Sequence, residues 1–257
     1  MAEKGSRALV AGNWKMNGTS ASMTEVRLLV EMLKGVELGC DVMICPPATL
    51  LSTLHKVLGT TKIRLGAQDC HSEPHGPFTG DISAEMIRDS GAAAVIVGHS
   101  ERRIGHGESN AMVRAKAGAA HRAGLRAIIC IGETKDEREA GETLPVLSRQ
   151  LRESLPADVG SSDTVIAYEP VWAIGTGLTP TISQITEAHA HIRHELIQVT
   201  GRAADRIGIL YGGSVKPGNA AEITAIDHVD GALVGGGSLK AADFIGIIKA
   251  YTGPQSR

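Results

Sequence analysis

The sequence predicts a (β/α)₈ barrel formed by a single domain, residues 1–257. Three observations support this prediction: short apolar runs recur along the chain, amphipathic stretches separate them, and about eight such pairs fit into the 257 residues. Strands that alternate with helices form a parallel sheet whose strands are buried on both faces. Eight strand–helix units in roughly 250 residues are typical of a sheet that closes into a barrel.

The predicted strands are short and rich in β-branched residues, as expected for strands buried on both faces. In chain order they cover residues 8–11, 42–45, 63–66, 95–98, 127–131, 165–168, 207–211 and 232–235. The clearest helical spacing of apolar residues falls in residues 22–34, 147–155 and 182–199. No Pro- or Ser-rich linker divides the chain, which indicates one domain.

An open, doubly wound sheet is the alternative fold. Such a sheet usually has fewer strands and a glycine-rich phosphate loop after the first strand. Here the first run continues into Asn-Trp-Lys-Met-Asn at 13–17, which lacks that glycine pattern. The barrel is therefore favoured.

The composition is that of an ordinary globular domain, with 42% hydrophobic residues and a formal net charge of −2. This charge gives no electrostatic footprint for nucleic acid or an anionic membrane, and no apolar run approaches the roughly 18 residues of a membrane span. The N-terminal apolar run is too short for a signal peptide. We expect a cytoplasmic protein with free thiols, because no CxxC pair occurs among Cys40, Cys45, Cys70 and Cys130.

Polar residues and glycines follow most of the predicted strands. The active site of such a barrel lies at the carboxyl ends of its strands, in the loops that follow them. We therefore expect one mouth to gather Asn13, Lys15, Gln68, His99, Glu101, Cys130, Glu133, Glu169, Ser214, Gly235 and Gly236.

Six motifs at these positions resemble those of the triosephosphate isomerase family. They are AGNWKMN at 11–17, VGHSERR at 97–103, CIGE at 130–133, AYEPVWAIGTG at 167–177, YGGSV at 211–215 and LVGGGSL at 233–239. The similarity runs from about residue 8 to residue 250, in order. It implies a TIM barrel, a homodimer without metal or organic cofactor, and interconversion of dihydroxyacetone phosphate and glyceraldehyde 3-phosphate.

The resemblance also implies a role for individual residues in proton transfer. Glu169 matches the base that moves a proton between adjacent carbons, and His99 matches the electrophile that stabilises the developing oxyanion. The resemblance implies that His99 acts as a neutral ring at a helix N-terminus, which is a standard example of pKa tuning from this family. Lys15 and Asn13 match further donors, and Glu101 is expected to be the ion-pair partner of Lys15, which is the one cation expected in the mouth.

Glycine-bearing loops are expected to bind the substrate phosphate through backbone N–H groups. The groups expected to contribute are those of Gly175, Ser214, Gly235 and Gly236. Residues 170–180 match the family's closing loop, a standard example of an active-site lid. Its far end reads Leu178-Thr179-Pro180 where many relatives read Lys-Thr-Ala, so lid motion is expected to differ, with Leu178 packed on the barrel rim.

The polar, Gly- and Pro-rich segment 68–82 resembles the loop that inserts into the neighbouring subunit of the family's dimers. Thr79 lies near its expected tip. We expect this loop to brace Asn13 and Lys15 of the partner. The cluster Cys70, His71, Glu73 and His75 could instead suggest a metal, but no second group of ligands accompanies it, so a surface or interface loop is favoured and no metal is expected.

Other functions stay open at this point. An isomerase of tetrulose phosphates would need a roomier mouth, and a non-catalytic phosphate-binding barrel would not need both Glu169 and His99. A Schiff-base aldolase could use Lys15. A serine nucleophile elbow is disfavoured because the GxSxG pattern fails at Arg102. The remaining polar cluster is expected on a helix surface, at His189, His191, His194 and Glu195.

Overall fold

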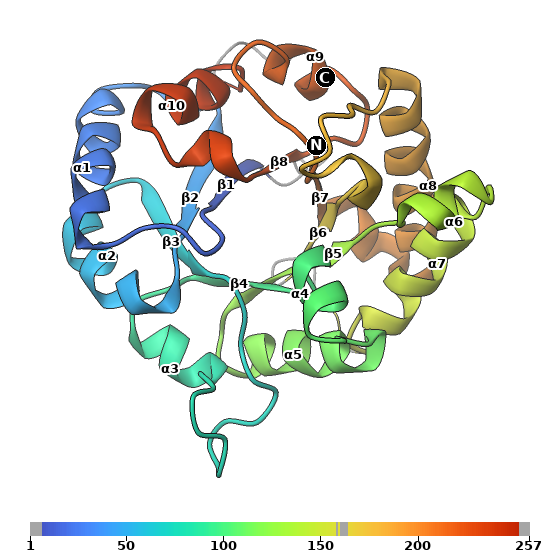
Figure 1. The fold of residues 1–257 in the computed structure, drawn as a ribbon, viewed down its shortest axis with the longest axis horizontal. Helices are drawn as coiled ribbons and strands as arrows, with labels where there is room; N and C mark the ends of the chain where they lie inside the picture. Colours follow the sequence, from blue (N-terminus) through green and yellow to red (C-terminus); the bar gives the residue numbers. More distant parts are fainter. Residues whose placement is uncertain (1–6, 158, 160–163, 252–257) are drawn as a thin grey trace.

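The computed structural model describes residues 7–157, 159 and 164–251, and these residues form one closed barrel of eight parallel strands (Figure 1). The strands pair in chain order, and the last pairs with the first. Their bounds are β1 (Ala8–Asn13), β2 (Cys40–Cys45), β3 (Ile63–Ala67), β4 (Ala94–Val97), β5 (Arg126–Ile131), β6 (Thr164–Tyr168), β7 (Gly208–Tyr211) and β8 (Gly231–Val234). The predicted fold class is confirmed.

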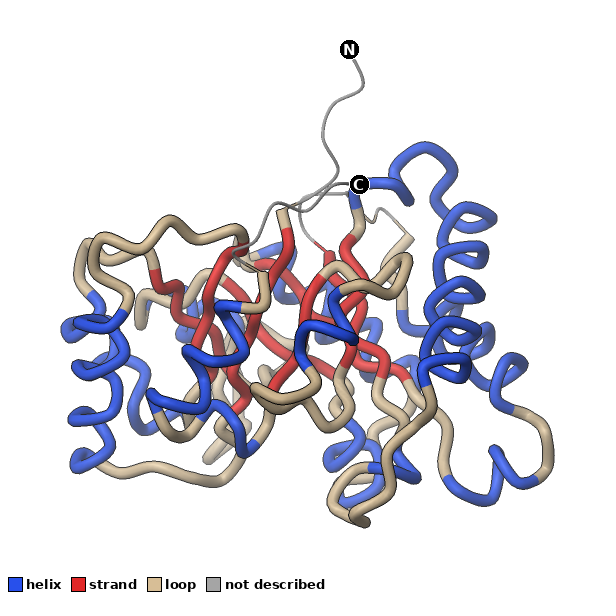
Figure 2. Tube along the Cα trace, turned by 90° about the horizontal axis from the view of Figure 1, so that it is seen from above, coloured by secondary structure: helices blue, strands red, loops and turns tan. Residues whose placement is uncertain are grey.

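Helices cover the outside of the barrel, and the strands lie enclosed between them (Figure 2). Several begin at a Ser or Thr whose side chain accepts a backbone N–H of the first turn, as at Ser83, Ser109 and Thr181. The helices are α1 (Met23–Met32), α2 (Leu51–Leu58), α3 (Ala84–Asp89), α4 (Ser100–Gly105), α5 (Asn110–Arg122), α6 (Lys135–Glu139), α7 (Thr143–Ser154), α8 (Ile182–Thr200), α9 (Ala220–Thr224) and α10 (Ala241–Lys249).

The core has two layers, as alternation along each strand requires. Outward-facing strand residues pack against the helices in one large cluster. Inward-facing residues fill the barrel and are mostly small, aliphatic or sulfur-containing: Leu9, Ala11, Met43, Cys45, Ala94, Ile96, Ile128, Cys130, Val165, Ala167, Leu210 and Leu233. The ends of β5, β6 and β7 are level, because Tyr168 pairs with both Ile131 and Tyr211. The residues that follow these strands therefore meet at one edge.

The predicted surface position of the α8 histidine cluster is wrong for two of its members. His189 is fully buried and Glu195 nearly so. The His189 ring lies edge-on to Tyr168, with 5.8 Å between ring centroids, so this helix presents a histidine to the core. None of the helices described here is long and apolar enough to cross a bilayer.

Candidate active site

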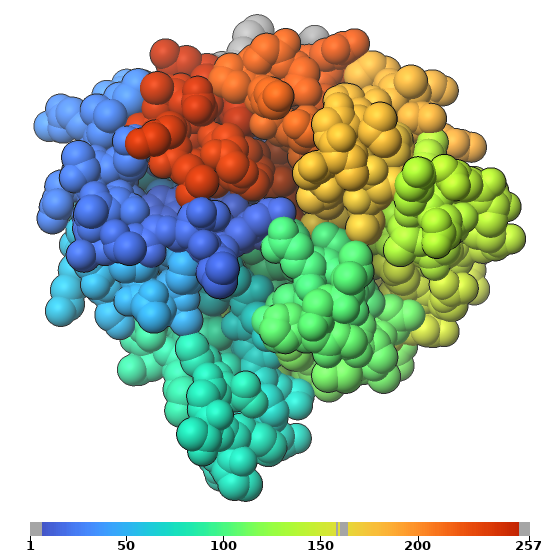
Figure 3. Space-filling model, viewed as in Figure 1, coloured from blue at the N-terminus to red at the C-terminus, as the bar shows by residue number. Residues whose placement is uncertain are grey.

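A cavity of about 870 Å³ opens at the carboxyl ends of the strands. In Figure 3 the segments after β1 (blue) and β8 (red), α4 (green) and the segment 170–180 (gold) meet around the middle of this face. All nine residues assigned from the sequence to catalysis or substrate binding line the cavity: Asn13, Lys15, His99, Glu101, Glu169, Gly175, Ser214, Gly235 and Gly236.

Glu169 directly follows β6 and is 2% exposed. Its Oε1 accepts hydrogen bonds from His99 Nε2 at 2.9 Å and Ser100 Oγ at 3.1 Å, and its Oε2 accepts the Ser100 N–H at 2.9 Å. Burial raises the pKa of this carboxyl group, but the His99 and Ser100 donors outweigh burial and hold the pKa below its ordinary value. The carboxylate is thus ionised and held against α4, at one wall of the cavity.

His99 is the N-cap residue of α4 and is also buried. Its Nδ1 accepts the Glu101 N–H at 3.2 Å, so Nδ1 carries no proton and Nε2 donates to Glu169. Burial lowers the pKa of His99, while the touching carboxylate of Glu169 raises it and leaves it above its ordinary value in this arrangement. The hydrogen bonds describe a neutral ring that can donate from Nε2.

Two glycines allow the backbone to pack tightly around Glu169. A Cβ on Gly132 would lie 1.7 Å from the carbonyl oxygen of Glu169, and one on Gly212 would lie 2.9 Å from its Cγ. Side chains at these positions would displace the carboxylate. Both glycines belong to motifs that are visible in the sequence, CIGE at 130–133 and YGGS at 211–214. Neither glycine is predicted from the sequence to be a site residue.

Lys15 is held in a left-handed backbone conformation, with φ of 54°, which is uncommon for a non-glycine residue. Asn13 Oδ1 accepts the Lys15 N–H at 3.0 Å, and Gln68 Nε2 donates to the Lys15 carbonyl at 2.8 Å. The Nζ of Lys15 lies 2.5 Å from Glu101 Oε1, so the expected ion pair is present. These contacts fix the ammonium group at the cavity wall.

Several expectations about the mouth are wrong. Lys15 is not its sole cation, because Lys216 also lines the cavity. Gln68, Cys130 and Glu133 are not among the lining residues. Gln68 lines a neighbouring groove. Cys130 points into the barrel, and Glu133 is buried, with its Oε1 accepting from Trp172 Nε1 at 2.8 Å. Cys130 is the last residue but one of β5 and Glu133 follows the strand, but neither side chain lines the cavity.

The glycine loops leave open space where a phosphate could approach backbone N–H groups. A Cβ built on Gly175 or Gly236 meets no atom within 4 Å, and one on Gly235 meets Lys15 Cε at 3.5 Å. The ends of β8 and β1 thus bring a glycine pair and a lysine together. Such a surface suits an anion.

The segment 170–180, which the sequence predicts to be a lid, contains a short 3₁₀ turn, Val171–Ala173, and leads to Thr181, the N-cap of α8. The indole of Trp172 binds Glu133 and lies under the Arg138 guanidinium, 4.5 Å from the ring centroid. The expected packing of Leu178 on the barrel rim is wrong, since this residue is 51% exposed and lines the cavity. Pro180 is buried.

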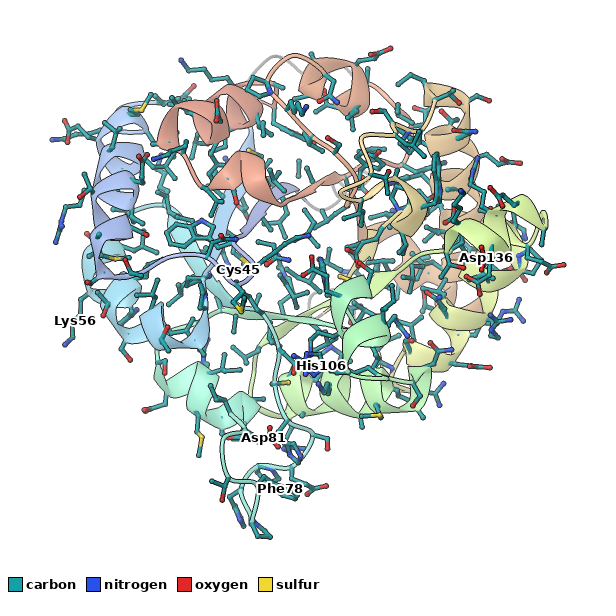
Figure 4. The ribbon with its side chains drawn as sticks, in the orientation of Figure 1. Cys45, Lys56, Phe78, Asp81, His106 and Asp136 are labelled. Atoms are coloured by element: carbon teal, nitrogen blue, oxygen red, sulfur yellow. The ribbon has the colours of Figure 1, made fainter. Side chains whose placement is uncertain are left out.

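A second groove, of about 750 Å³, lies beside the first and also contacts Asn13 and Lys15. Met16 lines it and is 96% exposed. The segment 68–82 projects from the body of the molecule, with Phe78 at its far end (Figures 1 and 4). Within it the His71 ring packs on Phe78 with 4.1 Å between centroids. No group of three or more His, Cys, Asp or Glu arranged to hold a metal occurs in the described part of the chain.

Comparisons with known proteins agree over nearly the whole chain. A family model described as triosephosphate isomerase matches residues 8–251. The chain is 58% identical over 248 residues to the triosephosphate isomerase of Mesorhizobium japonicum, covering 96% of this chain and 97% of that protein. For the Rhizobium meliloti enzyme the identity is 56% over 246 residues, covering 95% and 96%. The crystal structure of triosephosphate isomerase from Bartonella henselae has a TM-score of 0.90 at 48% identity, covering 96% of this chain and 100% of that one.

Proposed function

Since the chain belongs to the triosephosphate isomerase family and is an aldose–ketose isomerase, we propose that it interconverts dihydroxyacetone phosphate and D-glyceraldehyde 3-phosphate in the large cavity. One observation carries this proposal. An ionised Glu169 and an Nε2-protonated His99 touch at one wall, and the glycine loops and Lys15 line the same cavity. The cavity thus offers a base, an oxyanion donor and an anion cradle together.

Glu169 is proposed to be the base that moves a proton between the two carbons. In the described arrangement its carboxylate is occupied by His99 and Ser100. It must therefore leave these donors to reach a substrate carbon. Removing a proton from one carbon and returning it to the next passes through an enediolate, and the carboxylate serves both steps.

His99, Lys15 and Asn13 are proposed to stabilise the negative charge that forms on the substrate oxygens. The Asn13 oxygen is engaged by Lys15 N–H, so its amide N–H groups are the part left to donate. When Glu169 leaves for the substrate, His99 loses the neighbouring charge that raises its pKa. Burial and the N-terminus of α4 then favour the neutral ring. Glu101 holds the Lys15 ammonium in place.

The substrate phosphate is proposed to bind backbone N–H groups of Gly175, Ser214, Gly235 and Gly236. Gly235, directly after β8, lies beside Lys15 Cε, which supports an anion at this position. Closure of residues 170–180 would bring the Gly175 N–H to the phosphate and exclude water from the enediolate; lid closure in this family is a standard example.

A coupled assay with triose and tetrose phosphates tests the proposal. We expect fast turnover of the triose phosphates in both directions and much slower turnover of a tetrulose phosphate. Preferred turnover of the tetrose would support the alternative isomerase, and phosphate binding without turnover would support a non-catalytic barrel. Borohydride treatment in the presence of a ketose phosphate should leave Lys15 unlabelled, which separates an isomerase from a Schiff-base aldolase.

We further propose a homodimer in which the loop 68–82, with Thr79 near its tip, enters the partner's second groove. The groove is lined by Asn13 and Lys15, and the exposed Met16 gives it an apolar contact. Sedimentation should show a dimer, and a fully active monomer at nanomolar concentration would contradict this arrangement. A cytoplasmic location is also proposed, in keeping with the buried free thiols of Cys40, Cys45, Cys70 and Cys130.

A further inference from the structure

We propose that Lys216 is an electrostatic steering residue that draws the dianionic phosphate of the substrate into the cavity without taking part in the chemistry. This inference rests on the proposed function. It follows from three features of the residue: a rigid backbone, a free ammonium group, and the charge balance of the cavity that it lines.

The backbone of Lys216 is firmly anchored. Its N–H donates to Asn219 Oδ1 at 2.7 Å, and its carbonyl accepts the N–H groups of Asn219 and Ala220 at 3.1 and 3.0 Å. Pro217 follows, restricts Lys216 to extended conformations, and packs closely on Gly246 of α10. The root of the side chain is therefore fixed at the cavity edge.

The ammonium group of Lys216 is free, in contrast to that of Lys15. Lys216 is exposed, and its Nζ makes no hydrogen bond or ion pair with any other residue that the structure describes. The charge of Lys15 is opposed at 2.5 Å by Glu101. At the distances of an approaching substrate, the Lys15–Glu101 pair acts mainly as a dipole, whereas Lys216 acts as a full positive charge.

The charge balance makes this free lysine matter. Of the described residues, two lysines (Lys15 and Lys216) and three carboxylates (Glu101, Glu169 and Asp243) line the cavity. With His99 neutral, these side chains carry a net charge of −1, and the whole chain carries −2. Both would repel a phosphate dianion. Lys216 is the charge that offsets this repulsion at the entrance, where the substrate is still partly solvated.

Steering should be visible in the kinetics of such an enzyme. Triosephosphate isomerases are standard examples of enzymes whose kcat/KM approaches the diffusion limit. A charge at the rim changes the rate of association and its dependence on salt more than it changes the bound state. We therefore expect Lys216 to affect kcat/KM and leave kcat unchanged.

The test compares Lys216→Ala and Lys216→Glu with Lys56→Ala and Lys56→Glu. Lys56 is an exposed lysine of α2 that lies at the outer edge of the molecule (Figure 4), so these controls make the same change in net charge far from the cavity. The kcat/KM for glyceraldehyde 3-phosphate is measured between about 0.01 and 1 M ionic strength, where the Debye length falls from about 30 to about 3 Å. Unphosphorylated glyceraldehyde is the uncharged comparison substrate, and thermal unfolding checks the fold.

At low ionic strength we expect kcat/KM to fall about threefold in Lys216→Ala and about tenfold in Lys216→Glu. The difference should nearly vanish at 1 M, and neither variant should be impaired with glyceraldehyde. Equal losses in the Lys56 variants, a loss that persists at 1 M, or a loss confined to kcat would each overturn the steering role. A wild-type protein inactive on triose phosphates would instead overturn the proposed function itself.

Discussion

The end of β6 and the proposed lid, residues 170–180, are adjacent in sequence but are held very differently. Glu169 is buried, and three donors from His99 and Ser100 hold its carboxylate. Close backbone packing at Gly132 and Gly212 surrounds it. Without substrate, the Glu169 carboxylate is therefore held by many contacts.

The lid has room and few anchors. Residues 175–179 are exposed, and Gly175 and Gly177 adopt φ of 72° and 81° with open space around them. It is attached near its start, where the Trp172 indole and the Val171 N–H both donate to Glu133. A reacting group must be placed to within about 1 Å, whereas a loop that closes over an active site must be able to move. One continuous motif therefore combines a carboxylate with many contacts, the proposed base, with a loosely held segment, the proposed lid.

The largest expected effect concerns the support beneath the base. The His189 ring lies edge-on to Tyr168 and near Tyr211, the last residues of β6 and β7. Its Nδ1 donates to the His228 carbonyl at 2.9 Å, and its Nε2 has no partner among the described residues. Burial lowers the pKa of His189 to about 4, because a protonated ring would carry an unpaired N–H in the core.

This shift predicts a loss of stability in mild acid. Since the folded-state pKa lies below the unfolded value of about 6.5, the unfolded chain binds the proton first as the pH falls. The stabilisation that depends on a neutral His189 is therefore fully present above about pH 6.5. As the pH falls toward 4, the free energy of unfolding decreases by about 3 kcal/mol. Urea unfolding across this range should show a shallower loss for His189→Gln than for wild type, with His194→Gln as the exposed control. If the free energy of unfolding depends equally on pH in all three proteins, His189 is not the cause of the acid destabilisation.

The next effect concerns the base itself. Glu169→Asp keeps the charge but withdraws it by about one methylene from the position that the surrounding packing defines. We expect kcat to fall on the order of 10²-fold, because about 1 Å of misplacement can have this effect. Binding of phosphorylated inhibitors should change far less. Unaltered turnover in the variant would remove Glu169 from the mechanism.

A smaller loss is expected when the packing around the base is disturbed. In Gly212→Ala the new Cβ would lie 2.9 Å from Glu169 Cγ and 3.0 Å from the Tyr168 carbonyl oxygen. We expect about a tenfold fall in kcat, from a shift of the carboxylate smaller than that in Glu169→Asp. Gly218→Ala, in the same loop with open space around its Cβ, is the matched control. Similar kinetics in the two variants would mean that the base tolerates movement.

The same contrast explains which features could be predicted from the sequence and which could not. All eight strands were predicted, since each is a short apolar run, and the nine proposed site residues do line one cavity. Features that depend on packing across the barrel were missed. His189 lies four residues after Ile185 and three before Ile192, the helical spacing of a buried face, but a polar residue type does not by itself indicate the core. Lys216 joins the cavity because its loop is anchored through Asn219. The exposed Leu178 was expected to pack because apolar side chains usually do so.

The smallest expected effect lies at the far hinge of the lid. Pro180 is buried just before Thr181, the N-cap of α8, and directly after the exposed Leu178-Thr179 pair. Its ring fixes its own φ near −65° and keeps Thr179 extended. Fewer open conformations are then available to the lid, so less entropy is lost when the lid closes.

Pro180→Ala should therefore loosen the open lid and leave the chemistry at Glu169 unchanged. A compatible proline typically contributes about 0.4–1 kcal/mol, so we expect a carboxylate analogue of the enediolate carrying the same phosphate to bind about two- to fivefold more weakly. Lid exchange is measured by relaxation dispersion, and Pro145→Ala, at an exposed position in α7 away from the lid, is the control. Because the base is held by contacts outside the lid, kcat should stay within about twofold of wild type. Identical affinities and identical lid exchange rates would show that the hinge is neutral and that the looseness of the lid resides wholly in its glycine tip.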